Sequence, residues 1–111
     1  MTKVYYGTGF NKSKVGLCND GNIYTGSGLD KSKVGSYRNG DIYSGSSLHK
    51  CKIGSYKNGI VYLGTGFSKT KVGSYNNDSI YSGFGLQKTK IGSYIGDASG
   101  AAGALLLLFV K

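Results

Sequence analysis

Lysine residues occur in Lys-x-Lys pairs that return at a fixed interval of 19 residues. If the repeats close into a ring, the ten lysines lie at one level and concentrate positive potential on one rim. This pattern predicts an anion-binding rim. The alternative is that lysine only protects strand ends and aids solubility. The pairs are Lys12 and Lys14, Lys31 and Lys33, Lys50 and Lys52, Lys69 and Lys71, and Lys88 and Lys90.

The overall charge agrees with an anionic partner. Lysine and arginine number 14 against five acidic residues, which gives a net charge of +9. Such a balance favours nucleic acid, acidic glycans or an anionic membrane surface. Arg38 is the only arginine, and lysine contacts phosphate without bidentate base readout. Lipid headgroups or acidic glycans are therefore preferred to nucleic acid.

Tyrosine forms two further columns at the same interval. One hypothesis is a set of repeated aromatic ligand sites, as in a lectin-like module or a nucleic-acid stacking surface. The alternative, which we favour, is a packing layer with hydroxyl groups at the water boundary. The first column is Tyr5, Tyr24, Tyr43, Tyr62 and Tyr81; the second is Tyr37, Tyr56, Tyr75 and Tyr94, with Cys18 in the corresponding place.

Groups suited to catalysis or metal binding are scarce. His49 is the only histidine, and together with Cys51 it does not supply a tetrahedral zinc site. The carboxylates are expected at turns, where aspartate caps the backbone. We therefore expect a protein that is not an enzyme and has no cofactor or metal. The carboxylates are Asp20, Asp30, Asp41, Asp78 and Asp97.

The cysteines and the N-terminus suggest a compartment. Cys18 and Cys51 fall in different columns and are expected on opposite faces, so both are predicted to be reduced thiols. The first ten residues contain no apolar run of the secretory kind. We expect a cytoplasmic protein, with peripheral membrane attachment as the alternative.

Each repeat is typical of a β-hairpin. The first strand is Lys33–Tyr37 in one unit and the second begins at Ile42; both are rich in β-branched and aromatic residues. A two-residue Asn-Gly turn and a three-residue turn both fit the connection. Side-chain parity favours the three-residue turn, which would place Tyr43 over Gly35.

The links between hairpins each contain one large apolar residue. At this fixed spacing, each is expected to anchor its link on a shared core. The residues are Phe10, Leu29, Leu48, Phe67 and Leu86.

The two ends of the repeat region complement each other. Residues 2–9 match the second half of a unit, and residues 90–97 match a first half. Pairing them would make a fifth hairpin and remove the exposed sheet edges. The predicted fold is an all-β closed ring of five β-hairpin repeats in residues 1–97, and an open solenoid is the rival.

The tail, residues 98–111, belongs to no repeat. Its apolar stretch, residues 101–110, would span about 15 Å as a helix, roughly half a bilayer core. Helix and strand both fit so short a run. Because it is apolar all round, it must be buried. We expect it to drive self-association into a trimer or tetramer, or else to insert into a membrane beneath the lysine rim. The assembly residues would be Ala104, Leu105, Leu106, Leu107, Leu108, Phe109 and Val110.

The repeated motif V-G-S-Y-x-N-G-x-I-Y-S-G and the tail from Ile95 to Leu108 resemble the 4-fold beta-flower family of small bacterial or phage proteins. Members of this family combine short hairpin repeats with a Gly/Ala segment and a leucine run. The resemblance implies an unknown biochemical role and no transferable catalytic residues. This chain departs from the family pattern by giving five hairpin units.

Overall fold

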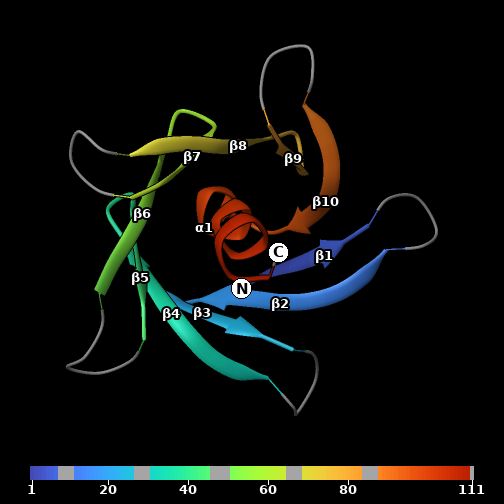
Figure 1. Cartoon of the computed structure of the whole chain (residues 1–111). Coiled ribbons are helices and arrows are strands. Elements are labelled where there is room, and N and C mark those ends of the chain that lie inside the picture. Colours follow the sequence, from blue (N-terminus) through green and yellow to red (C-terminus); the bar gives the residue numbers. More distant parts are fainter. Residues whose placement is uncertain (8–11, 27–30, 46–50, 65–68, 84–87, 111) are drawn as a thin grey trace.

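The computed structural model describes residues 1–7, 12–26, 31–45, 51–64, 69–83 and 88–110, the last without its side chain. The described residues form ten antiparallel strands and a C-terminal helical segment, which confirms the predicted all-β class (Figure 1). The strands are β1 (Thr2–Tyr6), β2 (Ser13–Asn19), β3 (Asn22–Thr25), β4 (Ser32–Arg38), β5 (Asp41–Ser44), β6 (Cys51–Lys57), β7 (Ile60–Leu63), β8 (Thr70–Asn76), β9 (Ser79–Ser82) and β10 (Thr89–Ile95).

The first and last strands pair and close the sheet. Lys3 lies opposite Ile95 and Tyr6 opposite Gly92, so β1 has β10 on one side and β2 on the other. The ring therefore has no free edge, as predicted from the complementary ends. Its principal extents are 39 × 38 × 21 Å, and the strands run outward from a central bore to the grey traces in Figure 1.

The tight turns differ from the prediction. Arg38 pairs with Asp41, so the turn holds only Asn39 and Gly40, with φ of 51° and 86°. Two positive φ angles define a type I′ turn, whose twist matches that of the flanking strands. The three-residue turn is wrong, and Tyr43 lies opposite Ser36 rather than over Gly35.

A β-bulge solves the side-chain parity problem that had favoured the longer turn. Between β5 and β6, Ile42 pairs with Gly54 and Tyr43 with Lys52, which leaves Ile53 as the extra residue. A bulge bends the strand and re-aims its side chains. Neighbouring residues of a regular strand point to opposite faces. Because of the bulge, Ile53 packs against the core although the next residue, Gly54, is buried as well. The equivalents of Ile53 are Val15, Val34, Val72 and Ile91.

The two tyrosine columns lie on opposite faces of the ring. Tyr37, Tyr56, Tyr75 and Tyr94 pack on the core, together with the fully buried Ile42 and its equivalents. The outward column lies on the side of Ser36, which pairs with Tyr43. Each inward tyrosine also ties two units together. For example, the backbone N–H of Tyr56 donates to the carbonyl oxygen of Gly40 at 2.8 Å.

The tail fills the bore of its own ring. The α-helix α1 (Ser99–Ala104) continues into the π-helix η6 (Leu105–Val110), and Figure 1 shows both encircled by the strands. The sequence left helix and strand open for the tail, and the structure shows a helix. Its small residues allow close approach: a Cβ atom on Gly103 would lie 3.2 Å from Val61, and one on Gly100 would run into the ring of Tyr56.

Five consecutive tail side chains each meet a different glycine of the ring. The glycines lie on β2, β10, β8, β6 and β4, which is their order around the ring. Five equal sectors are about 72° apart, whereas an α-helix turns about 100° per residue, and the wider i→i+5 π-helix turns less. The π-helix thus brings successive residues closer to the ring's spacing. The pairs are Leu105 with Gly16, Leu106 with Gly92, Leu107 with Gly73, Leu108 with Gly54 and Phe109 with Gly35.

Candidate functional site

Outward tyrosines form cation–π contacts with lysine, in which an ammonium group lies over the face of the aromatic ring. Lys69 Nζ lies 4.5 Å from the ring centroid of Tyr62, and Lys88 Nζ lies 4.7 Å from that of Tyr81. The same contact joins Lys31 to Tyr24 at 4.9 Å and Lys12 to Tyr5 at 5.1 Å. These distances are within the range of cation–π attraction.

The second lysine of each pair lies directly opposite the same tyrosine in the sheet. Lys71 pairs with Tyr62, and Lys90 pairs with Tyr81. Lys52 pairs with Tyr43 and also forms an ion pair of 2.9 Å with Asp41. We call these lysines and outward tyrosines the lysine–tyrosine belt. The equivalent pairs are Lys14 with Tyr5 and Lys33 with Tyr24.

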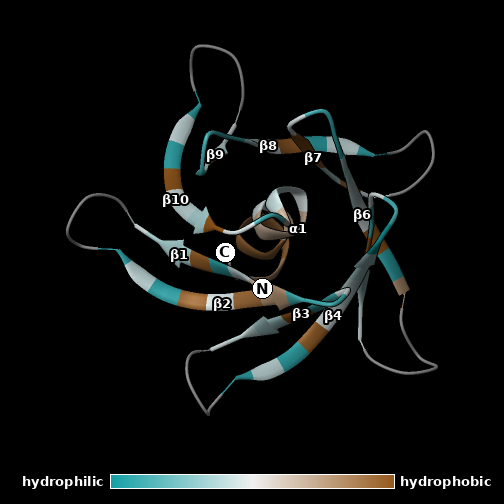
Figure 2. Cartoon of the chain, turned by 180° about the vertical axis from the view of Figure 1, so that it is seen from behind, coloured by the Kyte–Doolittle hydropathy of each residue, from teal (hydrophilic) through white to brown (hydrophobic). Residues whose placement is uncertain are grey.

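The belt follows the outer stretches of the strands. Figure 2 shows hydrophilic segments on β2, β4, β6, β8 and β10, next to the grey traces and on all sides of the ring. The described lysines of the predicted rim therefore lie around the ring, and their binding of an anion stays a prediction. Lys50, His49 and the apolar link residues Phe10, Leu29, Leu48, Phe67 and Leu86 lie outside the described residues.

The predicted self-association residues lie elsewhere. Ala104, Leu105, Leu106 and Leu107 are at most 4 % exposed because the strands of the same chain cover them. Leu108 and Phe109 are half-buried against the same core. The single ring therefore already removes most of the surface of these leucines from water. Self-association through the tail stays a prediction. The side chain of Val110 is not described.

Cys18 is buried, Cys51 is exposed, and neither forms a disulfide. The prediction that they lie on opposite faces is wrong, because Cys18 pairs with the inward Ile23 and Cys51 pairs with Ser44, on the face of Gly35. The bulge in each repeat had not been counted in the parity. Burial raises the pKa of the Cys18 thiol to about 12, because the thiolate would lose its hydration. The Cys18 thiol therefore stays protonated at neutral pH.

Cys18 replaces tyrosine where the tail enters the bore. Its strand partner is Thr2, whose hydroxyl oxygen accepts a hydrogen bond of 2.9 Å from the backbone N–H of Ala98. A Cβ atom on Gly96 would also lie close to Thr2. The small Cys18 side chain thus takes the place of a tyrosine next to the segment that connects β10 to the tail helix.

The inward tyrosines are partly withdrawn from water. Desolvation raises the pKa of Tyr37, Tyr56 and Tyr75. The rings of Tyr56 and Tyr75 meet edge to face with centroids 6.3 Å apart, an arrangement that aromatic pairs prefer. These tyrosines therefore support the tail helix rather than form an open ligand platform.

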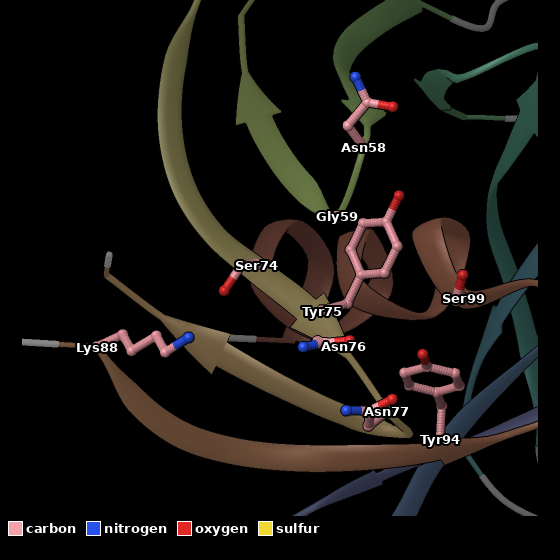
Figure 3. A pocket seen from close by; sticks show the side chains of 9 residues that line it. All are labelled: Asn58, Gly59, Ser74, Tyr75, Asn76, Asn77, Lys88, Tyr94 and Ser99. Atoms are coloured by element: carbon pink, nitrogen blue, oxygen red, sulfur yellow. The ribbon is translucent and has the colours of Figure 1, made fainter. Parts of the chain in front are cut away.

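Two polar pockets open between successive tight turns. One has a volume of about 540 Å³ and is lined by Asn58, Ser74, Asn76 and Lys88, among others. Figure 3 shows the hydroxyl-bearing Tyr75, Tyr94 and Ser99 at one side of this pocket and Lys88 at the other. The second pocket has a volume of about 550 Å³. We name them the Asn76 pocket and the Lys57 pocket. Sequence reasoning missed both, although their residues recur at the repeat interval.

The described residues offer little else for chemistry. No group of three or more His, Cys, Asp or Glu side chains among them is arranged to hold a metal ion. In the same part of the chain, no helix is long and apolar enough to cross a membrane. Asp20 and Asp78 occupy positive-φ turn positions, so their role is structural.

Comparison with known proteins gives no match: no family model, no curated protein and no solved structure is significantly similar to the chain. The class of the protein therefore comes from its own geometry. It is a closed antiparallel β-ring with an apolar helical plug and a basic, tyrosine-bearing exterior.

Proposed function

We propose that this protein is a non-enzymatic binding module that holds an acidic polysaccharide against its lysine–tyrosine belt. The observation that carries the proposal is the repeated placement of two lysines around each outward tyrosine, as at Tyr62 with Lys69 and Lys71. Carboxylate or sulfate groups along a polymer would meet ammonium groups at regular intervals.

The tyrosines prepare these lysines for binding. A lysine side chain loses much rotamer freedom when it is fixed by a ligand, and this cost lowers affinity. Lys69 and Lys88 already lie over aromatic faces, so part of this ordering is complete before the ligand arrives. Several weak contacts along one polymer then add through high effective concentration.

The distribution of the belt favours a flexible chain over a flat surface. Hydrophilic segments lie on all sides of the ring (Figure 2), so a polymer that follows the circumference can meet successive lysines. A planar bilayer would contact only those on the side it faces. Nucleic acid is disfavoured because Arg38 is the only arginine for bidentate readout.

The proposal includes the five-hairpin form of the ring. In this form each unit of 19 residues contributes one tyrosine and one lysine pair, so binding is multivalent. Assembly into a trimer or tetramer stays a separate prediction, which light scattering of the full chain tests directly.

Titration calorimetry with polygalacturonate tests the proposal, with neutral dextran as the control polymer. Binding is expected to weaken steeply as salt rises, because exposed charges are screened. Replacing Lys12, Lys31, Lys69 and Lys88 with glutamine should abolish most of it. Vesicles containing phosphatidylglycerol provide the decisive comparison: tight binding to them without binding to polygalacturonate would replace this proposal with a membrane function.

A further inference from the structure

The Lys57 pocket and the Asn76 pocket are the same place in two successive units of the chain. Their linings share five positions at which the residue type is also identical. Each position in one pocket is 19 residues from its counterpart in the other. The pairs are Asn39 and Asn58, Gly40 and Gly59, Ser55 and Ser74, Tyr56 and Tyr75, and Lys69 and Lys88.

One exchanged side chain changes the charge of the pocket. Lys57 lines the first pocket, and Asn76 takes its place in the second. The first pocket also holds Lys52, but the carboxylate of Asp41 lies 2.9 Å from its ammonium group. Lys57 and Lys69 therefore remain as its uncompensated cations, whereas Lys88 is the one charged residue that lines the Asn76 pocket in the described part of the chain.

The shared residues offer a fixed set of polar groups. Lys69 is held over the ring of Tyr62 at 4.5 Å, which limits where its ammonium group can lie. The Ser55 hydroxyl both donates and accepts, and the Asn39 amide does the same with separate atoms. Such groups suit a ligand that carries several hydroxyls and one anionic group. A volume of about 550 Å³ is within the range of small-ligand sites.

We propose that the Lys57 pocket binds one anionic sugar residue of an acidic polysaccharide, a uronate or a sulfated hexose. Lys57 and Lys69 hold the anionic group, and Asn39 and Ser55 bond the sugar hydroxyls. The Asn76 pocket is a weaker copy because it lacks the second cation. This inference rests on the proposed function, since it names the part of the polymer that is read.

The chain itself supplies the matched variants. K57N converts the first pocket to the chemistry of the second, and N76K makes the reverse change. K3N is the control, because Lys3 is exposed, lines neither pocket and lies outside the lysine–tyrosine belt. K57N and K3N remove the same charge from exposed positions, so a general electrostatic effect would be equal in both.

The probe is a galacturonate trimer, with maltotriose as its neutral counterpart, and affinity is measured by titration calorimetry. K57N should weaken trimer binding about tenfold, the effect of losing one charge-assisted hydrogen bond. K3N should change it by less than about twofold. N76K should strengthen binding by about tenfold at a second site, visible as a higher stoichiometry.

The other outcomes each overturn a defined part of this inference. Equal weakening by K57N and K3N overturns the pocket and assigns the effect to general electrostatic attraction. Binding of polygalacturonate without binding of the trimer overturns the pocket and leaves the belt as the binding surface. Inorganic sulfate that binds as tightly as the trimer reduces the site to simple anion binding and overturns the sugar assignment. If neither trimer nor polymer binds, both the pocket and the proposed function fail.

Discussion

Gly54 lies so close to Leu108 that a Cβ atom on this glycine would come within 3.0 Å of the leucine Cδ1 atom. The Cβ atom added at Gly54 would also run into the carbonyl oxygen of Tyr62 in the neighbouring strand. The glycine is therefore required both by the sheet and by the tail. This contact joins a residue in the middle of the repeats to one near the C-terminus, so ring and tail form a single core.

Gly54→Ala should destabilise the protein by about 3 kcal/mol, at the upper end of overpacking effects, because a backbone atom blocks the new methyl group. Urea unfolding followed by circular dichroism measures the loss. Gly21→Ala is the matched control: its φ is +82°, and the added Cβ atom would lie 3.5 Å from the carbonyl oxygen of Tyr37. The control should lose only about 1 kcal/mol through backbone strain. Equal losses would mean that the close approach to Leu108 and Tyr62 is not what requires glycine.

The match between tail and ring was only partly readable from the sequence. Residues 105–109 are five consecutive bulky side chains, and the V-G motif supplies five glycines at the repeat interval. Those two counts are the signal that could have placed the tail inside its own ring. Apolarity alone shows that a segment must be buried, but it does not say against which partner. The π-helical geometry depends on tertiary packing and has no local sequence signature.

Removing the tail should unfold the ring rather than leave a smaller folded ring. A truncation that ends at Asp97 would expose Val4, Ile42 and the other strand residues that are fully buried in the whole chain. The single change Leu106→Ala should cost about 2 to 5 kcal/mol, since this leucine is 1 % exposed. Differential scanning calorimetry of both variants tests this dependence on the tail.

The control for this test is Leu63→Ala, because Leu63 is 46 % exposed. It should change stability by no more than about 0.5 kcal/mol. A truncated chain that still unfolds cooperatively at the temperature of the whole chain would show that the strands do not need the tail. The tail would then be available for self-association, and light scattering would have to decide that role.

Cys18 should make the protein less stable at alkaline pH. Its pKa is about 12 in the folded chain against an ordinary value of 9.0, because burial disfavours the thiolate. Above pH 9 the unfolded thiol loses its proton while the folded thiol keeps it, so unfolding releases a proton. The contribution to stability is fully present below pH 9 and declines as pH rises towards 12, at most by about 1.4 kcal/mol per pH unit.

Urea unfolding at about pH 8 and about pH 10 measures this decline. Below pH 10 the tyrosines contribute little, because their ordinary pKa is 10.0 and desolvation raises the pKa of the buried ones. Cys18→Ala should lose most of the pH dependence, and Cys51→Ala should keep it. An unchanged slope in Cys18→Ala would contradict the assignment. A thiol reagent should modify Cys51 in the native protein and both cysteines in urea.

Other features could be predicted to different extents. The period, the strand positions and the closing pair of β1 and β10 followed from patterns that are local or depend on counting. The turn length was predicted wrongly, because the alternation of side chains between the two faces was counted as if the strands were regular. In the structure each Val-Gly or Ile-Gly pair forms a bulge, which shifts this alternation by one residue. The lysine columns were visible in the sequence, but their stacking on tyrosine depends on spatial positions that only the fold supplies.

The turn at Asn77 and Asp78 is less favourable than its equivalents, and one substitution should improve it. Asp78 has a φ of 67°, whereas glycine occupies the corresponding place at Gly59 with a φ of 85°. The backbone role is the same: the carbonyl oxygen of Asp78 accepts from Tyr94 N–H at 3.1 Å, and that of Gly59 from Tyr75 N–H at 2.9 Å. Asp78→Gly should therefore stabilise the protein by about 1 kcal/mol by removing left-handed strain.

The reverse change, Gly59→Asp, should destabilise the protein by a similar amount, and urea unfolding measures both. Asp78→Asn separates conformation from charge, because asparagine removes the carboxylate but keeps a Cβ atom. A gain in Asp78→Asn as large as that in Asp78→Gly would assign the effect to charge. If Gly59→Asp instead leaves stability unchanged, the type I′ turn tolerates aspartate without strain, and the difference between the two turns has no energetic consequence.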